Sequence, residues 1–200
     1  MILPSPEIWH RNDFADLCNW RKLWTAIEVG VDRGEFSQAF LHYWRGHNFI
    51  GVDNYEPHAD MPWNRDGDFQ VACLRYERHA QRAKLIKAHS VQFAKQLEAS
   101  RPQFFGGKPT QFVYIDGAHD YESVAADLAA WWPVVSPDGI LAGHDYDNDH
   151  PGVMRAVQEF ADRENVTVYL TTHDSPPSWY AYKTGMPGAD WIRNPRESST

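Results

Sequence analysis

The sequence predicts an α/β fold in which helices cover both faces of a mostly parallel sheet. Short segments of β-branched and aromatic residues alternate five times with segments whose apolar residues recur at helical spacing. Such alternation is typical of parallel strands joined by crossover helices. Two strand-like segments then follow one another directly around a turn, which predicts one antiparallel strand at the sheet edge. A chain of 200 residues suits a single domain, 1–200, with a full core.

The first half of the chain contains three of the predicted strands. Residues 1–23 carry apolar residues at roughly helical spacing, so this N-terminal extension is expected to pack on the domain as a short helix. The expected elements that follow are a strand at 24–30, a helix at 34–44, a strand at 48–53, a loop at 54–68, a helix at 69–83, a strand at 85–89 and a helix at 91–97.

The second half continues the alternation and ends in the strand pair. Pro151 favours a helix start, because the first turn of a helix needs no N–H at that position. The expected elements are a loop at 101–109, a strand at 112–115, a helix at 121–135, a turn at 137–139, a strand at 140–142, a helix at 151–163, strands at 166–171 and 179–183, and an irregular tail at 185–200.

Composition excludes several classes of partner. The net charge is −8, which argues against a nucleic acid bound through its phosphates. The two cysteines form no C-x-x-C pair, so a zinc or thioredoxin motif is absent from the sequence and a reducing cytoplasm is the expected compartment. No secretory leader and no apolar run long enough for a membrane span are visible, so neither a membrane nor nucleic acid is expected as a partner.

Two apolar strands each end in an aspartate and a histidine. Asp116 and His119 follow the strand at 112–115, and His144 and Asp145 follow the strand that begins at residue 140. In open α/β sheets, ligands bind beyond the carboxyl ends of the strands. The two strand ends could therefore converge on one divalent metal ion.

The first predicted strand leads into a glycine-containing turn. Glu28, Gly30 and Gly34 lie in this turn, and Asp53 ends the next strand 23 residues beyond Gly30. An acid about 20 residues past such a turn hydrogen-bonds ribose hydroxyls in dinucleotide-binding folds. The G-x-G-x-x-G phosphate motif is absent, however, so a nucleoside without phosphates fits the pattern better. The alternative is a plain tight turn between strand and helix.

Taken together, these motifs resemble those of class I S-adenosylmethionine-dependent methyltransferases. More narrowly, they are similar to those of the macrocin and mycinamicin sugar O-methyltransferases. The resemblance spans about residues 24–163 and implies a Rossmann-like, three-layer sandwich with seven strands in the order 3-2-1-4-5-7-6, the seventh antiparallel. The matching phrases are Glu28-x-Gly30-x-x-x-Gly34, Asp53, Ile115-Asp116-Gly117-x-His119, Trp131-Trp132-Pro133, Pro137-Asp138-Gly139-Ile140 and His144-Asp145-Tyr146.

The resemblance implies a role for each matching position. Glu28 and Gly30 would line the methionine part of S-adenosylmethionine, Asp53 would bind its ribose, and His89 and Ser90 would lie near its adenine. Gly34, Asn54 and Asp116 complete the expected cofactor-binding set. Asp116 and Asp145, with His144, would hold a divalent cation such as Mg²⁺ or Mn²⁺. Asp116 and His119 form the expected catalytic pair, with His119 as the general base.

His144 departs from the related metal-dependent enzymes, which often have Asp-Asp-Tyr where this chain has His144-Asp145-Tyr146. Imidazole suits zinc, iron or manganese better than magnesium. Either His144 is a ligand of a softer metal, or it points away from the site, or no metal binds and His119 and His144 act as base and orienting group. His150 lies in the loop nearest this site and is expected to be a surface or packing residue.

The resemblance implies transfer of a methyl group to a hydroxyl of a sugar or glycosylated small molecule. The short N-terminal extension leaves either an open pocket or one that a neighbouring subunit closes in a homo-oligomer. Two other functions remain as alternatives. A metal-dependent hydrolase could use Asp116, His119, His144 and Asp145 with a water nucleophile, and a non-catalytic module could bind the nucleoside without turnover.

Overall fold

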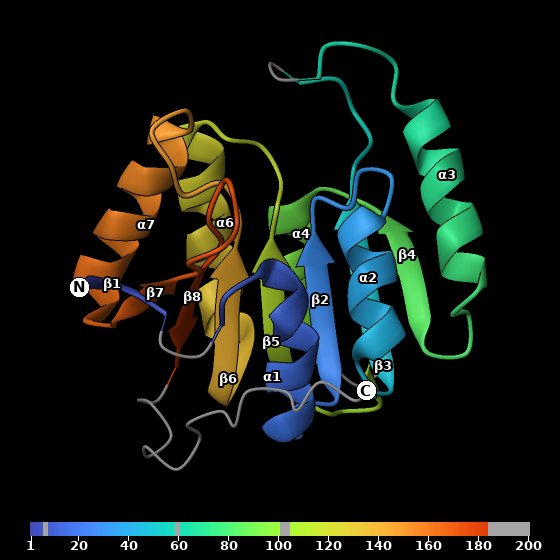
Figure 1. The fold of residues 1–200 in the computed structure, drawn as a ribbon. Coiled ribbons are helices and arrows are strands. Elements are labelled where there is room, and N and C mark those ends of the chain that lie inside the picture. The colour runs from blue at the N-terminus through green and yellow to red at the C-terminus, as the bar shows by residue number, and fades with distance from the viewer. Residues whose placement is uncertain (6–7, 59–60, 101–104, 184–200) are drawn as a thin grey trace, which may run out of the picture.

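A single sheet with strands from both ends of the sequence forms the core of the molecule. The computed structural model describes residues 1–5, 8–58, 61–100 and 105–183. The strands are β1 (Ile2–Pro4), β2 (Thr25–Val29), β3 (Asn48–Asp53), β4 (Ala83–Lys87), β5 (Thr110–Ile115), β6 (Val135–Gly143), β7 (Val168–Leu170) and β8 (Trp179–Tyr182). They form an eight-stranded sheet in the order β1-β7-β8-β6-β5-β2-β3-β4 (Figure 1).

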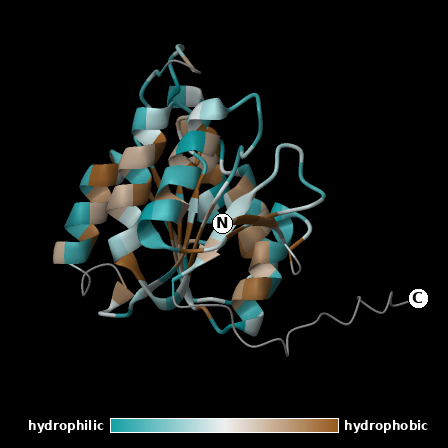
Figure 2. Cartoon of the chain, turned by 90° about the vertical axis from the view of Figure 1, so that its left-hand side faces the viewer, coloured by the Kyte–Doolittle hydropathy of each residue, from teal (hydrophilic) through white to brown (hydrophobic). Residues whose placement is uncertain are grey.

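Helices cover both faces of this sheet. They are the 3₁₀ helix η1 (Arg11–Asp13) and the α-helices α1 (Phe14–Trp20), α2 (Glu35–Tyr43), α3 (Asp66–Glu77), α4 (Ser90–Ala99), α6 (Tyr121–Val134) and α7 (Pro151–Glu164). Apolar residues of α1, α2 and α3 pack against one face, and those of α4, α6 and α7 pack against the other. Figure 2 shows hydrophobic strands in the interior, between helices in which hydrophilic and hydrophobic residues are mixed.

Strand residues point alternately into the two apolar layers. In β2, Ala26 packs in the layer with α1 and α2, whereas Ile27 and Val29 pack in the layer with α4 and α6. This burial on both faces explains why the central strands are apolar nearly throughout. Trp131 of α6 is fully buried at 0 % exposure, and burial of a large apolar side chain contributes about 1.5–3 kcal/mol.

The predicted fold class is confirmed, and the seven predicted strands lie in the predicted order. Strand β8 pairs antiparallel with β6 and β7, as expected for the closing pair. The prediction that the antiparallel strand lies at the sheet edge is wrong, because β7 and β1 lie beyond β8. The sheet has one more strand than predicted, because Ile2–Pro4 pairs in parallel with Val168–Leu170. The prediction of a helical extension over residues 1–23 is therefore wrong for Ile2–Pro4, which form a strand. A strand of three residues is too short to show a period in the sequence, and its partner is distant in the chain.

Two boundaries also differ from the prediction. The turn expected at 137–139 lies inside β6, where the register with β5 shifts between Thr110 and Phe112. Helix α3 spans Asp66–Glu77 rather than the predicted 69–83. Strand β4 spans Ala83–Lys87 rather than the predicted 85–89. Asp66 is a good first-turn residue because its charge complements the helix dipole, although it lies in a polar segment that resembles a loop. The tail expected at 185–200 lies outside the described residues.

The topology determines where a ligand can bind. Strands β2 to β6 run parallel, so all five end at the edge that lies at the top of Figure 1. The loops that follow these strands carry the polar side chains singled out in the sequence. No helix within the described residues has both the length and the apolar character that a bilayer crossing requires.

Candidate active site

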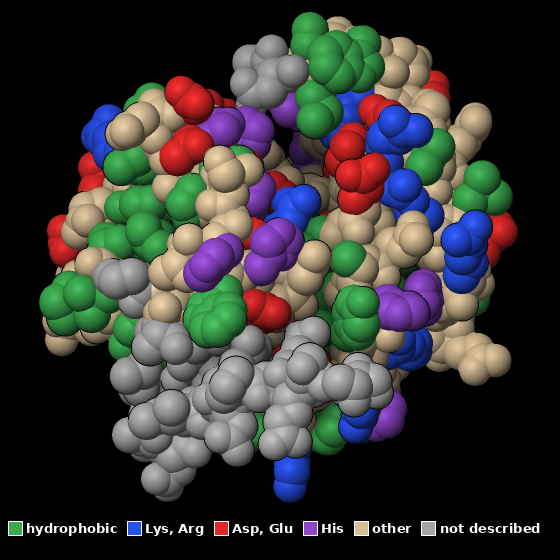
Figure 3. All heavy atoms as spheres, viewed as in Figure 1, with side chains coloured by type: hydrophobic (Ala, Val, Ile, Leu, Met, Phe, Trp, Pro, Cys, Tyr) green, Lys and Arg blue, Asp and Glu red, His purple; other side chains and the backbone are tan. Residues whose placement is uncertain are grey.

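A large cavity opens at the carboxyl edge of the sheet. Its volume is about 830 Å³, and it extends from the end of β4 past β3 and β2 to the end of β5. Figure 3 shows a hollow on this face that histidine, acidic and basic side chains border. The predicted site residues that line the cavity are Glu28, Gly30, Asp53, Asn54, His89, Ser90, Asp116 and His119.

Gly30 allows the turn after β2 to pass close to the end of β5. Its φ is +81°, and a Cβ at this position would lie 2.1 Å from the backbone oxygen of Asp116. The Gly30 N–H donates to the Val52 carbonyl at 2.9 Å, which fixes the turn to β3. Gly34 has a φ of +79° at the N-cap of α2 and does not line the cavity. Its role in the structure is to start the helix.

Glu28 presents a buried carboxyl group to the cavity. Ser37 of α2 donates a hydrogen bond to Glu28 Oε2, and the Tyr76 hydroxyl of α3 donates to the same oxygen at 3.4 Å. Burial raises the pKa of Glu28 well above its ordinary value, and these hydrogen bonds oppose the rise only in part. The carboxyl group therefore favours its neutral form, which can both donate and accept a hydrogen bond.

Asp53 lies in the cavity wall with several hydrogen bonds already formed. Its Oδ2 accepts from the Asp32 N–H at 2.9 Å, and its Oδ1 accepts from the Tyr55 N–H at 2.7 Å and from Arg65 Nη1 at 3.3 Å. Arg65 also donates to Asp32 Oδ1 at 2.9 Å. A carboxylate has about four lone-pair sites, so these three contacts leave acceptor capacity for one hydroxyl group.

The far end of the cavity is formed by the segment after β4. Asn54 Nδ2 lies 3.2 Å from His89 Nδ1. The Ser90 hydroxyl donates to Asp127 Oδ1 at 2.5 Å and accepts from Trp131 Nε1 at 2.7 Å. Burial raises the pKa of Asp127 to about 6. Ser90 is thus held by two groups of α6, and Asp127 supplies a further acid to this wall.

The two Asp- and His-bearing strand ends meet as the sequence predicts. Asp145 lies between two imidazoles, with its Oδ2 3.0 Å from His119 Nε2 and its Oδ1 2.9 Å from His144 Nδ1. Asp116 Oδ1 lies 3.8 Å from the same His144 nitrogen. His144 therefore points toward both carboxylates, which contradicts the alternative in which it points away from the site.

The charges in this cluster shift one another's pKa. Burial favours neutral Asp145, but the hydrogen bonds from His119 and His144 outweigh it and hold the pKa of Asp145 far below its usual range. Burial opposes a charged His144, yet its hydrogen bond to Asp145 and the charge of Asp116 raise its pKa. Burial and repulsion from Asp145 raise the pKa of Asp116, although His144 and Arg11 counteract them.

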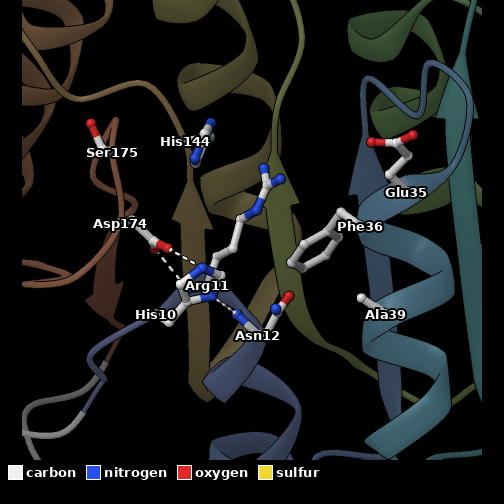
Figure 4. A pocket seen from close by; sticks show the side chains of 9 residues that line it. All are labelled: His10, Arg11, Asn12, Glu35, Phe36, Ala39, His144, Asp174 and Ser175. Atoms are coloured by element: carbon white, nitrogen blue, oxygen red, sulfur yellow. Dashed lines mark hydrogen bonds and ion pairs between the residues drawn. The ribbon is translucent and has the colours of Figure 1, made fainter.

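A second, smaller cavity of about 270 Å³ adjoins the cluster. Arg11, from the N-terminal segment, extends between His144 and Phe36, as Figure 4 shows. Its Nη1 lies 3.8 Å from Asp116 Oδ2, and its backbone N–H donates to Asp174 Oδ2 at 2.6 Å. The wall of the small cavity consists of His10, Arg11, Asn12, Glu35, Phe36, Ala39, His144, Asp174 and Ser175.

Several of these residues were not predicted from the sequence. Arg11 lies in a segment that the sequence marks only as a packing extension, so no pattern indicates its role. Asp127 had a usable signal, because it follows Val124 by three residues and precedes Trp131 by four, which places it on the buried face of α6. A buried acid on an apolar helix face usually has a specific partner or a function.

The cluster contains donor sets suitable for a cation. Among the described residues, Asp116, His144 and Asp145 each offer one ligand atom, and these atoms lie within 4.8 Å of one another. His119, Asp145 and His150 form a second such group. Two carboxylates and one imidazole fit a divalent metal, so the residues that the sequence singled out are compatible with the predicted cation.

The mostly parallel sheet, with a large cavity at its carboxyl edge and an Asp/His cluster beside it, is a Rossmann-like α/β domain with a ligand site at the usual edge. A family model described as a methyltransferase domain matches residues 27–146. The chain belongs to this family. No curated protein sequence matches the chain.

Solved structures share the fold at low sequence identity. An O-methyltransferase from Bacillus cereus in complex with SAH is 12% identical, with a TM-score of 0.65, and the match covers 90% of this chain and 84% of that one. CalS11, a calicheamicin methyltransferase, is 17% identical, with a TM-score of 0.64 and coverages of 86% and 77%. TomG from Streptomyces achromogenes, in complex with SAM, is 15% identical, with a TM-score of 0.64 and coverages of 88% and 79%.

Proposed function

We propose that this chain is an S-adenosylmethionine-dependent O-methyltransferase that acts on a hydroxyl group of a sugar or glycosylated small molecule. One observation carries the proposal. The large and small cavities share Arg11, Glu35 and Phe36 in their walls, and the Asp116–His144 contact lies where they adjoin. A donor in one cavity and an acceptor in the other would meet beside the Asp/His cluster.

The large cavity suits the methyl donor. The buried Glu28 carboxyl group and the close turn at Gly30 would receive the amino-acid part, Asp53 would accept from a ribose hydroxyl, and Ser90 would lie at the adenine end. Two structural neighbours are described as complexes with SAH and SAM, which supports the same type of ligand for this fold. The absence of a phosphate-binding glycine motif agrees with a nucleoside cofactor that carries no phosphate.

The small cavity suits the acceptor. About 270 Å³ accommodates a single sugar ring, and the wall combines the aromatic face of Phe36 with charged groups of Arg11, Glu35 and Asp174. Sugars are bound through such a pairing of apolar contact and hydrogen bonds. One structural neighbour is described as a TDP-rhamnose 3'-O-methyltransferase, which supports a sugar as the class of acceptor.

His119 has the arrangement of a general base. The carboxylate of Asp145 can only accept a hydrogen bond, so His119 Nε2 donates to it across 3.0 Å and Nδ1 is the nitrogen that receives a proton. Asp145 fixes the ring orientation and stabilises the imidazolium that forms, as in an Asp–His pair of a hydrolase triad. The acceptor hydroxyl would lose its proton to His119 while its oxygen attacks the methyl carbon of the sulfonium donor, and the carbon–sulfur bond would break to leave S-adenosylhomocysteine.

Asp116, His144 and Asp145 would hold the divalent cation. When bound, such a cation lowers the pKa of an acceptor hydroxyl and orients it toward the donor. Arg11 lies beside Asp116 and offsets part of the negative charge of this group. Its guanidinium also faces the small cavity, where it can hydrogen-bond an acceptor oxygen.

Methyl transfer from radiolabelled S-adenosylmethionine to a panel of sugars and sugar nucleotides, with and without Mg²⁺ or Mn²⁺, tests the proposal. We expect His119→Ala to reduce the rate by about 10²–10⁴-fold, the usual contribution of a general base. His42→Ala, which changes an exposed histidine of α2, is the matched control. Unchanged transfer by His119→Ala, or cofactor binding with no transfer to any hydroxylated acceptor, would contradict the proposal.

The same assay separates the alternatives. Asp116→Ala should abolish the dependence on added cation and lower the transfer rate while some cofactor affinity persists, because the other cavity walls remain. A metal-dependent hydrolase would instead lose an activity that does not require S-adenosylmethionine at all. A binding module would retain affinity and show no product with the wild-type chain.

A further inference from the structure

We infer that His119, Asp145 and His150 form a second cation site, which selects a transition metal such as Zn²⁺ and inhibits methyl transfer when it is filled. The inhibitory consequence rests on the proposed function, because it depends on His119 as the base. The binding site itself does not. None of the roles expected for the cluster involves His150.

The three side chains come from different segments and already face one another. His119 follows β5, Asp145 follows β6, and His150 is the N-cap residue of α7. The rings of His119 and His150 have centroids 4.6 Å apart at an interplanar angle of 62°. One ligand atom from each residue lies within 4.8 Å of the others. A zinc ion about 2.0–2.1 Å from each ligand requires ligand atoms roughly 3.3 Å apart, so a small closure of the group completes the site.

His150 is oriented as a metal-binding histidine is. Its Nδ1 lies 2.8 Å from Asp147 Oδ1, and this oxygen also accepts from the backbone N–H groups of Asp149 at 3.1 Å and His150 at 3.2 Å. Because the carboxylate can only accept, Nδ1 carries the proton and Nε2 carries the lone pair. A carboxylate that fixes the tautomer of a histidine in this way typically supports a metal ligand.

The donor types distinguish this group from its neighbour. Two imidazoles and one carboxylate favour zinc, iron, cobalt or nickel, whereas magnesium prefers oxygen ligands. The neighbouring group of Asp116, His144 and Asp145 contains two carboxylates and one imidazole. Asp145 belongs to both groups, so binding at one site changes the affinity of the other. The cluster can therefore respond differently to Mg²⁺ and to Zn²⁺.

Zinc binding would remove the base. In the metal-free cluster His119 Nε2 donates its proton to Asp145 across 3.0 Å, so Nε2 can bind a cation only when this proton has moved to Nδ1. A neutral imidazole bound through Nε2 has its remaining proton on Nδ1, so no nitrogen is left to accept a proton from the acceptor. We therefore expect Zn²⁺ to lower the rate of methyl transfer and a chelator to restore it.

Metal titration of the full chain, without cofactor or acceptor, tests the site. In chelator-treated protein we expect Co²⁺ to give the visible absorption of a four-coordinate N/O site and Zn²⁺ to displace it at one equivalent. His150→Ala should weaken Zn²⁺ binding at least tenfold, and Asp147→Asn should weaken it by about 10–100-fold, as loss of an outer carboxylate does. His173→Ala is the control, because this histidine contacts Trp9 rather than the cluster. Circular dichroism checks that each variant is folded.

Wild-type Zn²⁺ affinity in folded His150→Ala would overturn the site. An activity measurement then tests the inhibition separately. Zn²⁺ should inhibit wild-type transfer at a concentration that leaves His150→Ala at its own zinc-free rate. If Zn²⁺ binds through His150 and transfer is unaffected, the inhibitory half of the inference is wrong and the role of His119 as base fails with it, whereas the binding site stands.

Discussion

Gly30 shows how one residue shapes the large cavity, and a single substitution there tests this role. We expect Gly30→Ala to destabilise the fold by roughly 2–5 kcal/mol, because alanine is strained at positive φ and its Cβ would overlap the Asp116 backbone. Urea unfolding measures the change. Gly67→Ala is the matched control: Gly67 lies in α3 with nothing within 4 Å of a Cβ, so alanine should stabilise by about 0.5–1 kcal/mol. Equal stabilities of the two variants would contradict this interpretation of the turn.

The raised pKa of Asp127 predicts that the free energy of unfolding depends on pH. The pKa of Asp127, about 6 in the folded chain, exceeds the ordinary aspartate value of 3.8, so the folded state still binds the proton at pH values where the unfolded state has lost it. The contribution of Asp127 to the free energy of unfolding is therefore greatest below pH 3.8 and declines as the pH rises to about 6. Asp127→Asn keeps an acceptor for Ser90, removes this decline and should be more stable than wild type at pH 8, by up to about 3 kcal/mol.

Unfolding of Asp127→Asn and wild type at pH 4 and pH 8 checks this prediction. The two proteins should differ by less than about 1 kcal/mol at pH 4, where Asp127 is protonated in the folded state and only partly ionised in the unfolded state. A stability difference of equal size at both pH values would show that the substitution acts through packing rather than through the carboxyl charge.

The site residues differ in how far the sequence reveals them. Asp116, His144 and Asp145 were predictable, because each directly follows an apolar strand of a parallel sheet. Arg11 was not, because its contact with Asp116 depends on how the N-terminal segment crosses the strand ends. Arg65 lies in a polar stretch that resembles a solvent-exposed loop, yet its side chain is 4 % exposed between Asp32 and Asp53. Only the tertiary fold brings such charges together.

Strand β1 illustrates the same limit for a whole element. The Val168 N–H donates to the Met1 carbonyl at 2.8 Å, and the Ser5 N–H donates to the Leu170 carbonyl at 2.5 Å. We expect removal of residues 1–4 to lower the free energy of unfolding, at about 0.5–1.5 kcal/mol for each hydrogen bond lost. Differential scanning fluorimetry measures the effect. Leu3→Lys, which changes a partly exposed side chain and leaves the backbone bonds, should have a small effect, and equal effects of both changes would contradict this role of β1.

Other elements were predictable because their signals are local. Helix α7 begins at Pro151 as expected, and its apolar residues recur on one face. The turn expected at Pro137-Asp138-Gly139 was wrong because β6 continues through it with an irregular register to β5. Proline and glycine usually end a strand, but they also occur at irregularities within one, and the sequence alone does not separate these cases.

At the scale of the whole molecule, sheet order determines where the candidate site lies. Strands β4, β3, β2, β5 and β6 lie side by side, so the residues after them line one edge from Ser90 in the large cavity to the Asp/His cluster. This order followed from the alternation of strands and helices together with the family resemblance. The small cavity could not be predicted in the same way, because its wall is formed in part by the N-terminal segment and by the loop between β7 and β8.

Calorimetric titration of S-adenosylhomocysteine into the purified chain tests most directly whether this edge binds a nucleoside cofactor. We predict one binding site, with an affinity that falls at least tenfold, or about 1.4 kcal/mol, in folded Asp53→Ala. The affinity should be unchanged in Glu98→Ala, which alters an exposed residue of α4. No heat of binding at millimolar ligand, or wild-type affinity in Asp53→Ala, would contradict the account.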